Sequence, residues 1–204
     1  TWEVVNKANV GLELGLFNGM VDLQFDLFDE RRHNIFMPRE SIPITAGFIK
    51  QPWDNYGKMK NQGAEVTLNI NKQFNKNLFV SLMGTLTYAH NEITEKDEPA
   101  AVVGTNRAET GYPTGQNRGY IAERLFTNDD FADVAAGTLK EGIPAQTFTA
   151  KLRPGDIKYV DVNQDGKIDA FDVSPIGGPI NPEIVYGFGL NMKWKDLDFG
   201  VLFQ

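Results

Sequence analysis

Apolar and polar side chains alternate residue by residue in several stretches of this chain. In residues 10–16 the apolar side chains occupy the even positions, and in residues 21–27 they occupy the odd positions. A period of two is the period of a β-strand. The dipeptide Asn18-Gly19 separates the two stretches, and it suits a type I′ turn because both central residues of that turn need positive φ. The pattern therefore predicts a tight β-hairpin.

The same alternation recurs in two further pairs of stretches. Residues 64–71 and 78–88 form the second pair, and residues 184–194 and 197–203 form the third. Short polar links join the two members of each pair, as expected for hairpins. The chain is therefore expected to contain six strands in three hairpins, with strands of about ten residues.

The connections between these strands alternate in length. Brief turns are expected near residues 17–20, 74–77 and 194–197, and long stretches near 29–62 and 91–182. The wall of an outer-membrane barrel has this pattern, because one rim carries tight turns and the other carries long loops. The predicted fold class is all-β, built from antiparallel hairpins, and part of a transmembrane β-barrel is one architecture that fits this pattern.

Alternation alone leaves two kinds of all-β protein open. The apolar side of each strand faces lipid in a membrane barrel, and it faces a dry core in a soluble sandwich or barrel. Strands of about ten residues favour the membrane barrel, as do Tyr88, Tyr186 and Trp194 near predicted strand ends. Helical insertion is excluded, since no window approaches the roughly 20 apolar residues that a spanning helix needs.

Composition narrows the function classes. The 204 residues include 20 Lys+Arg and 27 Asp+Glu, which gives a formal charge of −7 and argues against nucleic-acid binding. Cysteine is absent, so disulfides, thiolate zinc sites and cysteine nucleophiles are excluded. The chain begins at Thr1 without Met and ends within an apolar alternation, so we expect it to be a fragment of a longer protein.

An acidic stretch between residues 161 and 172 has the spacing of a calcium-binding loop. Oxygen-bearing side chains stand at loop positions 1, 3, 5, 9 and 12, and Gly166 at position 6 allows the sharp turn after which a backbone carbonyl binds. Ile168 at position 8 is expected to pack beneath the loop. The expected ligands of a structural Ca²⁺ are Asp161, Asn163, Asp165, Lys167 through its carbonyl, Asp169 and Asp172.

Two features of this stretch depart from an EF-hand. Position 12 is Asp172 where an EF-hand has Glu, which resembles the dockerin variant and gives a shorter reach to the ion. No amphipathic helix precedes the loop, because Pro154-Gly155 breaks the chain. A solvated Asx-rich turn without an ion is the alternative interpretation.

The sequence contains no arrangement that favours catalysis. His33 and His90 are the only histidines, and both are expected to be solvated rim residues, so a nucleophile triad is disfavoured and the protein is not expected to be an enzyme. Aromatic residues in the long stretches suit stacking against sugars, although they equally suit a small core within the loops. These weak substrate-binding candidates are Trp53, Tyr56, Tyr112, Tyr120 and Phe126.

Three motifs together resemble one known family. They are residues 56–65, which lead into a strand; Gly155-Asp156-Ile157-Lys158-Tyr159, which runs into the acidic loop; and Pro175-Ile176-Gly177 followed by residues 182–190. In combination they resemble the C-terminal part of the SusC/RagA family of TonB-dependent outer-membrane transporters. The resemblance covers nearly the whole chain.

The resemblance implies a 22-stranded barrel with an N-terminal plug, in the outer membrane of a Gram-negative bacterium. It implies import of glycans or peptides with a SusD-like surface lipoprotein, powered by the TonB complex. Residues 1–95 would then be two barrel hairpins with one long loop, 96–182 a long extracellular loop with the calcium site, and 183–204 a truncated hairpin in contact with outer-membrane lipid. A soluble secreted β-rich glycan-binding module with a dockerin-like calcium loop is the competing hypothesis.

Overall fold

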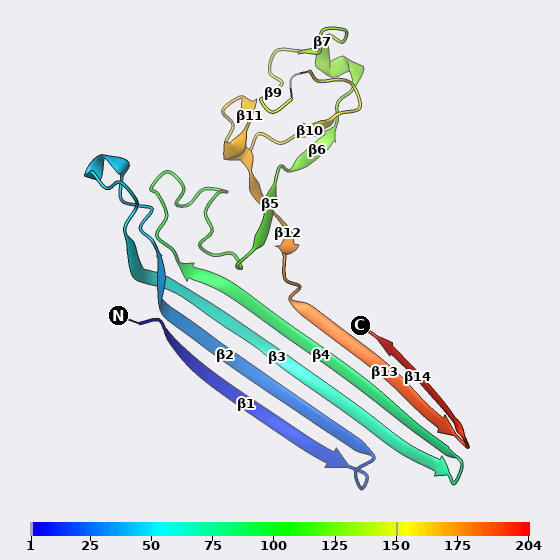
Figure 1. The fold of residues 1–204 in the computed structure, drawn as a ribbon. Coiled ribbons are helices and arrows are strands. Elements are labelled where there is room, and N and C mark those ends of the chain that lie inside the picture. Colours follow the sequence, from blue (N-terminus) through cyan, green and yellow to red (C-terminus); the bar gives the residue numbers. More distant parts are fainter. Residues whose placement is uncertain (1, 150) are drawn as a thin grey trace.

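The computed structural model describes residues 2–149 and 151–204, and its largest element is a six-stranded antiparallel sheet (Figure 1). The strand order is β1-β2-β3-β4-β13-β14, so neighbours in the sheet are also successive long strands of the chain. The three predicted hairpins are confirmed. The strands are β1 (Val4–Leu16), β2 (Val21–Pro38), β3 (Trp53–Asn75), β4 (Leu78–Glu95), β13 (Ile184–Trp194) and β14 (Leu197–Phe203).

The tight turns lie together at one end of the sheet (Figure 1). Between β1 and β2, Asn18 has φ 57° and Gly19 has φ 80°, the positive values that the type I′ prediction required. Phe17 also adopts a positive φ of 55°, which extends the left-handed segment by one residue. The other two turns are formed by residues 76–77 and 195–196.

Three strands are much longer than the expected ten residues. β3 has 23 residues, and β2 and β4 have 18 each, so the long connections shrink to residues 39–52 and 96–183. The sequence pattern missed these extensions because charged and polar residues interrupt the apolar alternation there, as in residues 29–34 and 60–62. Backbone pairing continues there, with a cross-strand ion pair of 2.7 Å between Lys60 and Glu92. Hydrophobic alternation thus marks only the part of each strand that carries the apolar face.

The register places the apolar side chains on one face of the sheet. One row of mutually paired residues crosses all six strands: Leu14, Leu23, Leu68, Gly84, Phe188 and Phe203. The adjacent row points to the opposite face and is polar or small: Glu13, Gln24, Thr67, Thr85 and Gly187. We call these the apolar face and the polar face. The apolar residues at even positions of 10–16 and at odd positions of 21–27 share the apolar face, as predicted.

A folded module rises from the sheet on the side opposite the tight turns (Figure 1). The strands β5 (Gln116–Gly119) and β12 (Ser174–Pro179) pair to form a two-stranded ribbon, and residues 120–173 beyond it are called the loop module. Its elements are β6 (Ala122–Leu125), η2 (Asn128–Asp130), β7 (Phe131–Asp133), β8 (Thr138–Leu139), β9 (Ala145–Gln146), β10 (Ile157–Tyr159), β11 (Lys167–Ile168) and η3 (Ala170–Asp172). The pair β9 and β11 is parallel, unlike the rest of the chain.

The buried apolar residues belong to the long second connection and not to the sheet. Within the described part of the chain, the hydrophobic side chains that are buried are Ala108, Phe126, Phe131, Leu152 and Ile168. Phe126, Phe131 and Leu152 form the core of the loop module, and Leu139 and Ile143 pack against them. The connection 39–52 contains the short helix η1 (Ile44–Ala46). No described helix is long and apolar enough to cross a membrane.

Candidate functional site

The acidic loop lies within the loop module, between β10 and the ribbon strand β12. Its side-chain oxygens accept hydrogen bonds from backbone N–H groups of the same loop. Asp161 accepts from Asp165 at 3.2 Å and from Gly166 at 2.8 Å, and Asp165 accepts from Lys167 at 3.0 Å. Asn163 accepts from Asp165 at 3.1 Å. These Asx turns bend the chain sharply at Gly166, which has φ 85°.

The second half of the loop is held in place by the burial of Ile168 and by backbone pairing with β9. Ile168 is 1% exposed, so the prediction that position 8 packs inward is confirmed. The carbonyls of Gly166 and Ile168 accept hydrogen bonds from Ala145 and Thr147, which attach β11 to β9. Carbonyls alternate along a strand, so the Lys167 carbonyl points away from β9.

Asp172 is the most buried carboxylate of the chain, with 0% exposure. One of its oxygens accepts from Val162 at 2.8 Å, and the other accepts from Asp169 at 2.8 Å. Asp169 caps the short helix η3 by accepting from Phe171 at 2.8 Å. Among residues 2–149 and 151–204, no group of three or more His, Cys, Asp and Glu side chains is arranged to hold a metal ion. Calcium binding by this loop therefore stays a prediction.

The five aromatic candidates do not form one surface. Trp53 begins β3 and packs against Phe36, with ring centroids 5.2 Å apart. Tyr120 stacks on Phe148 at 4.7 Å and contacts Tyr159 at 5.4 Å, which makes a small aromatic cluster within the loop module. Their role in binding substrate stays a prediction.

The remaining three candidates lie apart from these groups. The guanidinium of Arg39 lies 4.5 Å from the ring centre of Tyr56, and that of Arg118 lies 5.3 Å from Tyr112. Phe126 is 2% exposed in the core of the loop module, so the structure places it among packing residues instead of on a ligand-facing surface. Aromatic content alone did not distinguish core residues from surface residues.

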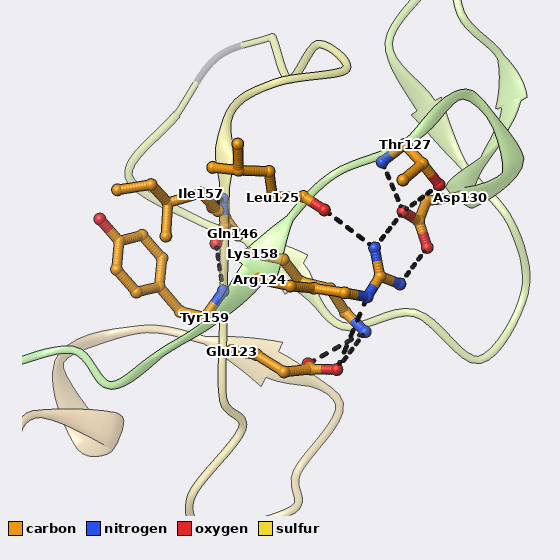
Figure 2. Close-up of polar contacts among 9 residues, drawn as sticks. All are labelled: Glu123, Arg124, Leu125, Thr127, Asp130, Gln146, Ile157, Lys158 and Tyr159. Atoms are coloured by element: carbon orange, nitrogen blue, oxygen red, sulfur yellow. Dashed lines mark hydrogen bonds and ion pairs between the residues drawn. The ribbon is translucent and has the colours of Figure 1, made fainter.

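A polar network that the sequence did not predict organises the middle of the loop module (Figure 2). Arg124, on β6, donates two hydrogen bonds of 2.6 Å to the two oxygens of Asp130. Thr127 donates to Asp130 from its backbone at 2.8 Å and from its hydroxyl at 3.1 Å. The spacing Thr127-x-x-Asp130 is a capping-box pattern and is a sequence signal that could have indicated this turn. Beside it, Lys158 reaches Glu123 at 3.0 Å, which links β10 to β6.

The Arg124 guanidinium and the Thr127 donors hold the pKa of the Asp130 carboxyl well below its usual range. Asp97 has a comparable environment between the two long connections. Burial raises the pKa of Asp97, but hydrogen bonds from the hydroxyl and backbone of Ser41 and from Arg39 outweigh it, and the net pKa is lowered. These bonds are 2.9, 3.0 and 3.1 Å long. Both carboxylates therefore stabilise loop structure as anions.

The predicted rim histidines lie at the polar extension of the sheet. The Nδ1 atom of His90 is 2.6 Å from Glu183, which joins the end of β4 to the segment before β13. His33 lies near the outer end of β2, opposite Val4. Both histidines are only partly exposed.

Comparison with known proteins connects this sheet to a family of barrels. The family described as TonB dependent receptor-like, beta-barrel, has a model that matches residues 1–196. The chain is 28% identical over 208 residues to TonB-dependent receptor P26 of Formosa agariphila. It is 24% identical over 205 residues to TonB-dependent receptor SusC of Bacteroides thetaiotaomicron. The alignments cover 100% and 97% of this chain but 20% and 19% of the relatives, so the chain spans about a fifth of their length.

Solved structures give the same fold. The RagAB peptide importer in the closed-closed state matches 99% of this chain and 21% of its own, with a TM-score of 0.67 and 21% identity. The RagAB peptide transporter matches 98% of this chain and 21% of its own, with a TM-score of 0.65 and 23% identity. At these identities the likeness concerns the fold: antiparallel sheet, tight turns on one side and long connections on the other.

Proposed function

Because this chain belongs to the TonB dependent receptor-like β-barrel family, we propose that its sheet is part of the wall of an outer-membrane transporter in a Gram-negative bacterium. The observation that carries this proposal is the apolar face, which continues across all six strands without a covering layer among the described residues. Large apolar side chains on it, such as Phe188 at 53% exposure, lie open. Lipid is the environment in which such a face is stable.

The height of the apolar face fits a membrane. On β13 it extends from Ile184 to Trp194, a distance of about 33 Å along the strand. With the usual barrel tilt of about 40°, this corresponds to roughly 25 Å along the membrane normal, the height of the apolar band in outer-membrane barrels. The soluble-module hypothesis requires the same side chains to meet a dry core, which the described residues do not provide.

The transported cargo is proposed to be a glycan or a peptide. SusC and RagAB are relatives whose names place them among TonB-dependent receptors and peptide importers. We further propose that the long connections are extracellular, that a SusD-like lipoprotein is the surface partner, and that the TonB complex supplies energy. In this arrangement the loop module lies on the side from which cargo arrives.

A pair of neighbouring substitutions on β2 tests the membrane assignment. Leu23→Arg places a charge on the apolar face near its middle, and we expect it to destabilise the folded barrel by about 2–4 kcal/mol. Gln24→Arg places the same charge on the polar face and is the matched control, with little effect expected. The measurement is heat-modifiable gel mobility of the full-length protein in outer-membrane fractions. Equal folding of both variants would contradict a lipid-facing apolar face.

We also propose that the acidic loop binds one Ca²⁺ as a structural ion. Asp161, Asn163 and Asp165 supply the hard oxygen ligands that calcium prefers, and their Asx turns hold them in one sharp bend. Asp172 is a buried carboxylate, and the hydrogen-bond donors to its side chain among the described residues are backbone N–H groups and not cationic side chains. A bound ion would supply that missing positive charge.

Calcium titration of the full-length protein tests this site. Asp161→Ala removes a charged ligand, and we expect calcium affinity to fall at least about tenfold. Glu141→Ala removes one acidic group elsewhere in the loop module and is the matched control, with unchanged affinity expected. Isothermal titration calorimetry gives both values. Identical titrations for wild type and Asp161→Ala would show that this loop is a turn without an ion.

A further inference from the structure

A hollow of about 330 Å³ lies where the polar face of the sheet meets the base of the ribbon. The sheet contributes Glu30, Asn61 and Asn91, which lie opposite one another in a single row across β2, β3 and β4. The second connection contributes Thr114, just before β5, and Asn181, just after β12. Because three of the lining residues are asparagines, we call it the amide hollow.

The row of the amide hollow belongs to the polar face. Glu30 follows Gln24 by six residues and Asn61 precedes Thr67 by six, and side chains an even number of positions apart share one side of a strand. In the proposed orientation the polar face borders the water-filled interior of the barrel. The amide hollow then lies inside the barrel at the level of the long connections.

Backbone contacts hold the two segments of the second connection against the sheet. The N–H of Thr114 donates to the side-chain oxygen of Asn91 at 2.7 Å. At the base of the ribbon, the N–H of Ile180 donates to the carbonyl of Gly115 at 2.9 Å, so the segments before β5 and after β12 lie side by side. The hollow is therefore formed before any ligand enters it.

These contacts leave most of the amide groups free. Among the described residues, the side chains of Asn61 and Asn181 make no hydrogen bond, and Asn91 uses its oxygen alone. Asn61 and Asn91 are half-buried and Asn181 is exposed. A carboxamide presents two N–H donors beside a carbonyl acceptor, which is the donor and acceptor pattern of a peptide group. The free amides therefore suit a peptide main chain.

The charged residues of the lining already have partners. Glu30 pairs with Lys7 at 2.5 Å, and Arg32 pairs with Glu3 at 3.1 Å. Lys60 is paired at 2.7 Å with the carboxylate opposite it on β4. A cargo segment that enters the amide hollow therefore needs no net charge.

Between the two proposed classes of cargo, the lining favours a peptide. Within the described part of the chain, no aromatic ring lines the hollow. A sugar ring gains much of its binding from an aromatic ring, because the flat apolar face packs against its C–H groups. Met59 provides apolar surface for a small side chain instead. The volume lies at the lower end of the range of about 300–1,000 Å³ for ligand pockets, so a short segment fits.

We propose that the amide hollow binds a short neutral segment of a peptide cargo through its main-chain groups, with Asn61, Asn91 and Asn181 as specificity-determining residues. The inference rests on the proposed transport function and narrows its cargo from a glycan or a peptide to a peptide. Main-chain recognition is tolerant of side-chain sequence, so one site of this kind serves many peptides.

The first test compares three probes on the full-length protein in detergent, together with any lipoprotein that co-purifies. The probes are a neutral pentapeptide of alanine and serine, its analogue with ester linkages in place of the internal amides, and a glucose pentasaccharide. Isothermal titration calorimetry gives the affinities. We expect the pentapeptide to bind at least about tenfold more tightly than either other probe, because only it carries the main-chain N–H donors.

The second test removes two of the free amides. We expect Asn61→Ala with Asn181→Ala to lower the pentapeptide affinity at least about tenfold, through the loss of their hydrogen bonds. Asn69→Ala is the matched control, since Asn69 lies on the same strand and the same face but outside the hollow, and its affinity should be unchanged. If the double variant fails to fold, Asn181→Ala alone carries the test, because this exposed side chain contacts no polar partner among the described residues.

Several results overturn the inference while leaving the proposed function intact. They are unchanged pentapeptide affinity in the folded variant, equal binding of the ester analogue, tighter binding of the pentasaccharide, and no pentapeptide binding by a folded barrel. A protein that stays soluble and folded without detergent would instead overturn the proposed function itself.

Discussion

Asp130 shows how one side chain organises a loop without regular structure. Its carboxylate accepts four hydrogen bonds, two from Arg124 and two from Thr127, and it is 5% exposed. The capping-box spacing of Thr127 and Asp130 could have indicated a turn, but nothing in the sequence pairs Arg124 with Asp130. That pairing depends on the path of the chain through η2, which short-range patterns do not specify.

Acid should loosen the loop module at Asp130. Its pKa in the folded protein lies below the unfolded value of about 3.9, so its stabilising effect is fully present above about pH 4. The effect is lost as pH falls through the lowered folded pKa. Hydrogen–deuterium exchange at residues 124–131 should therefore accelerate below about pH 4, after correction for intrinsic rates. In Asp130→Asn the acid-dependent change should be absent, and a change of equal size there would contradict this role.

The conformation of the acidic loop was predicted more fully than the contacts of Asp130, because the residues that shape the loop lie within twelve positions of one another. The oxygen-bearing positions, the turn at Gly166 and the burial of Ile168 all follow from a twelve-residue pattern. The role of Asp172 was not foreseen in the same detail. Its oxygens accept from Val162 and Asp169, and its complete burial depends on the module packed around it.

At the scale of elements, the hairpins were predictable and the strand lengths were not. A period of two and short polar links fix which segments pair, whatever the surroundings. The ends of β2, β3 and β4 depend instead on cross-strand polar pairs, such as Lys60 with Glu92. Such pairs leave no hydrophobic period in the sequence, so the extended parts of the strands were expected to be loops.

Two glycines in neighbouring strands allow a test of strand packing. A Cβ added at Gly63 on β3 would collide with the backbone oxygen of Tyr88 and the ring of Phe28, while a Cβ at Gly84 on β4 would meet nothing within 4 Å. We expect Gly63→Ala to destabilise the barrel by about 1–3 kcal/mol, because the backbone oxygen cannot move aside easily. Urea unfolding in detergent measures this, with Gly84→Ala as the near-neutral control. Equal urea midpoints for the two variants would show that β3 and β4 can move apart at Gly63 without loss of stability.

At the scale of the whole molecule, alternation predicted a sheet with one apolar and one polar face. It did not show whether the apolar face meets lipid or a dry protein core. A sandwich and a membrane barrel share the same period, and only the arrangement of all six strands distinguishes them. In the row from Leu14 to Phe203, Leu14, Phe188 and Phe203 are exposed, Leu23 and Leu68 are half-buried, and the buried apolar residues of the described chain lie elsewhere. The family resemblance, carried by motifs such as residues 56–65, favoured the membrane barrel.

In the proposed membrane orientation, the unequal ends of the strands set how far the protein projects from the bilayer. On one side the sheet stops at tight turns, but β3 continues for about ten residues past the apolar face, from Gln62 back to Trp53. At barrel tilt this adds a rigid collar of roughly 25 Å, with the loop module above it. In that orientation, cargo would meet the loop module and this collar of paired strands before it reaches the level of the hydrocarbon.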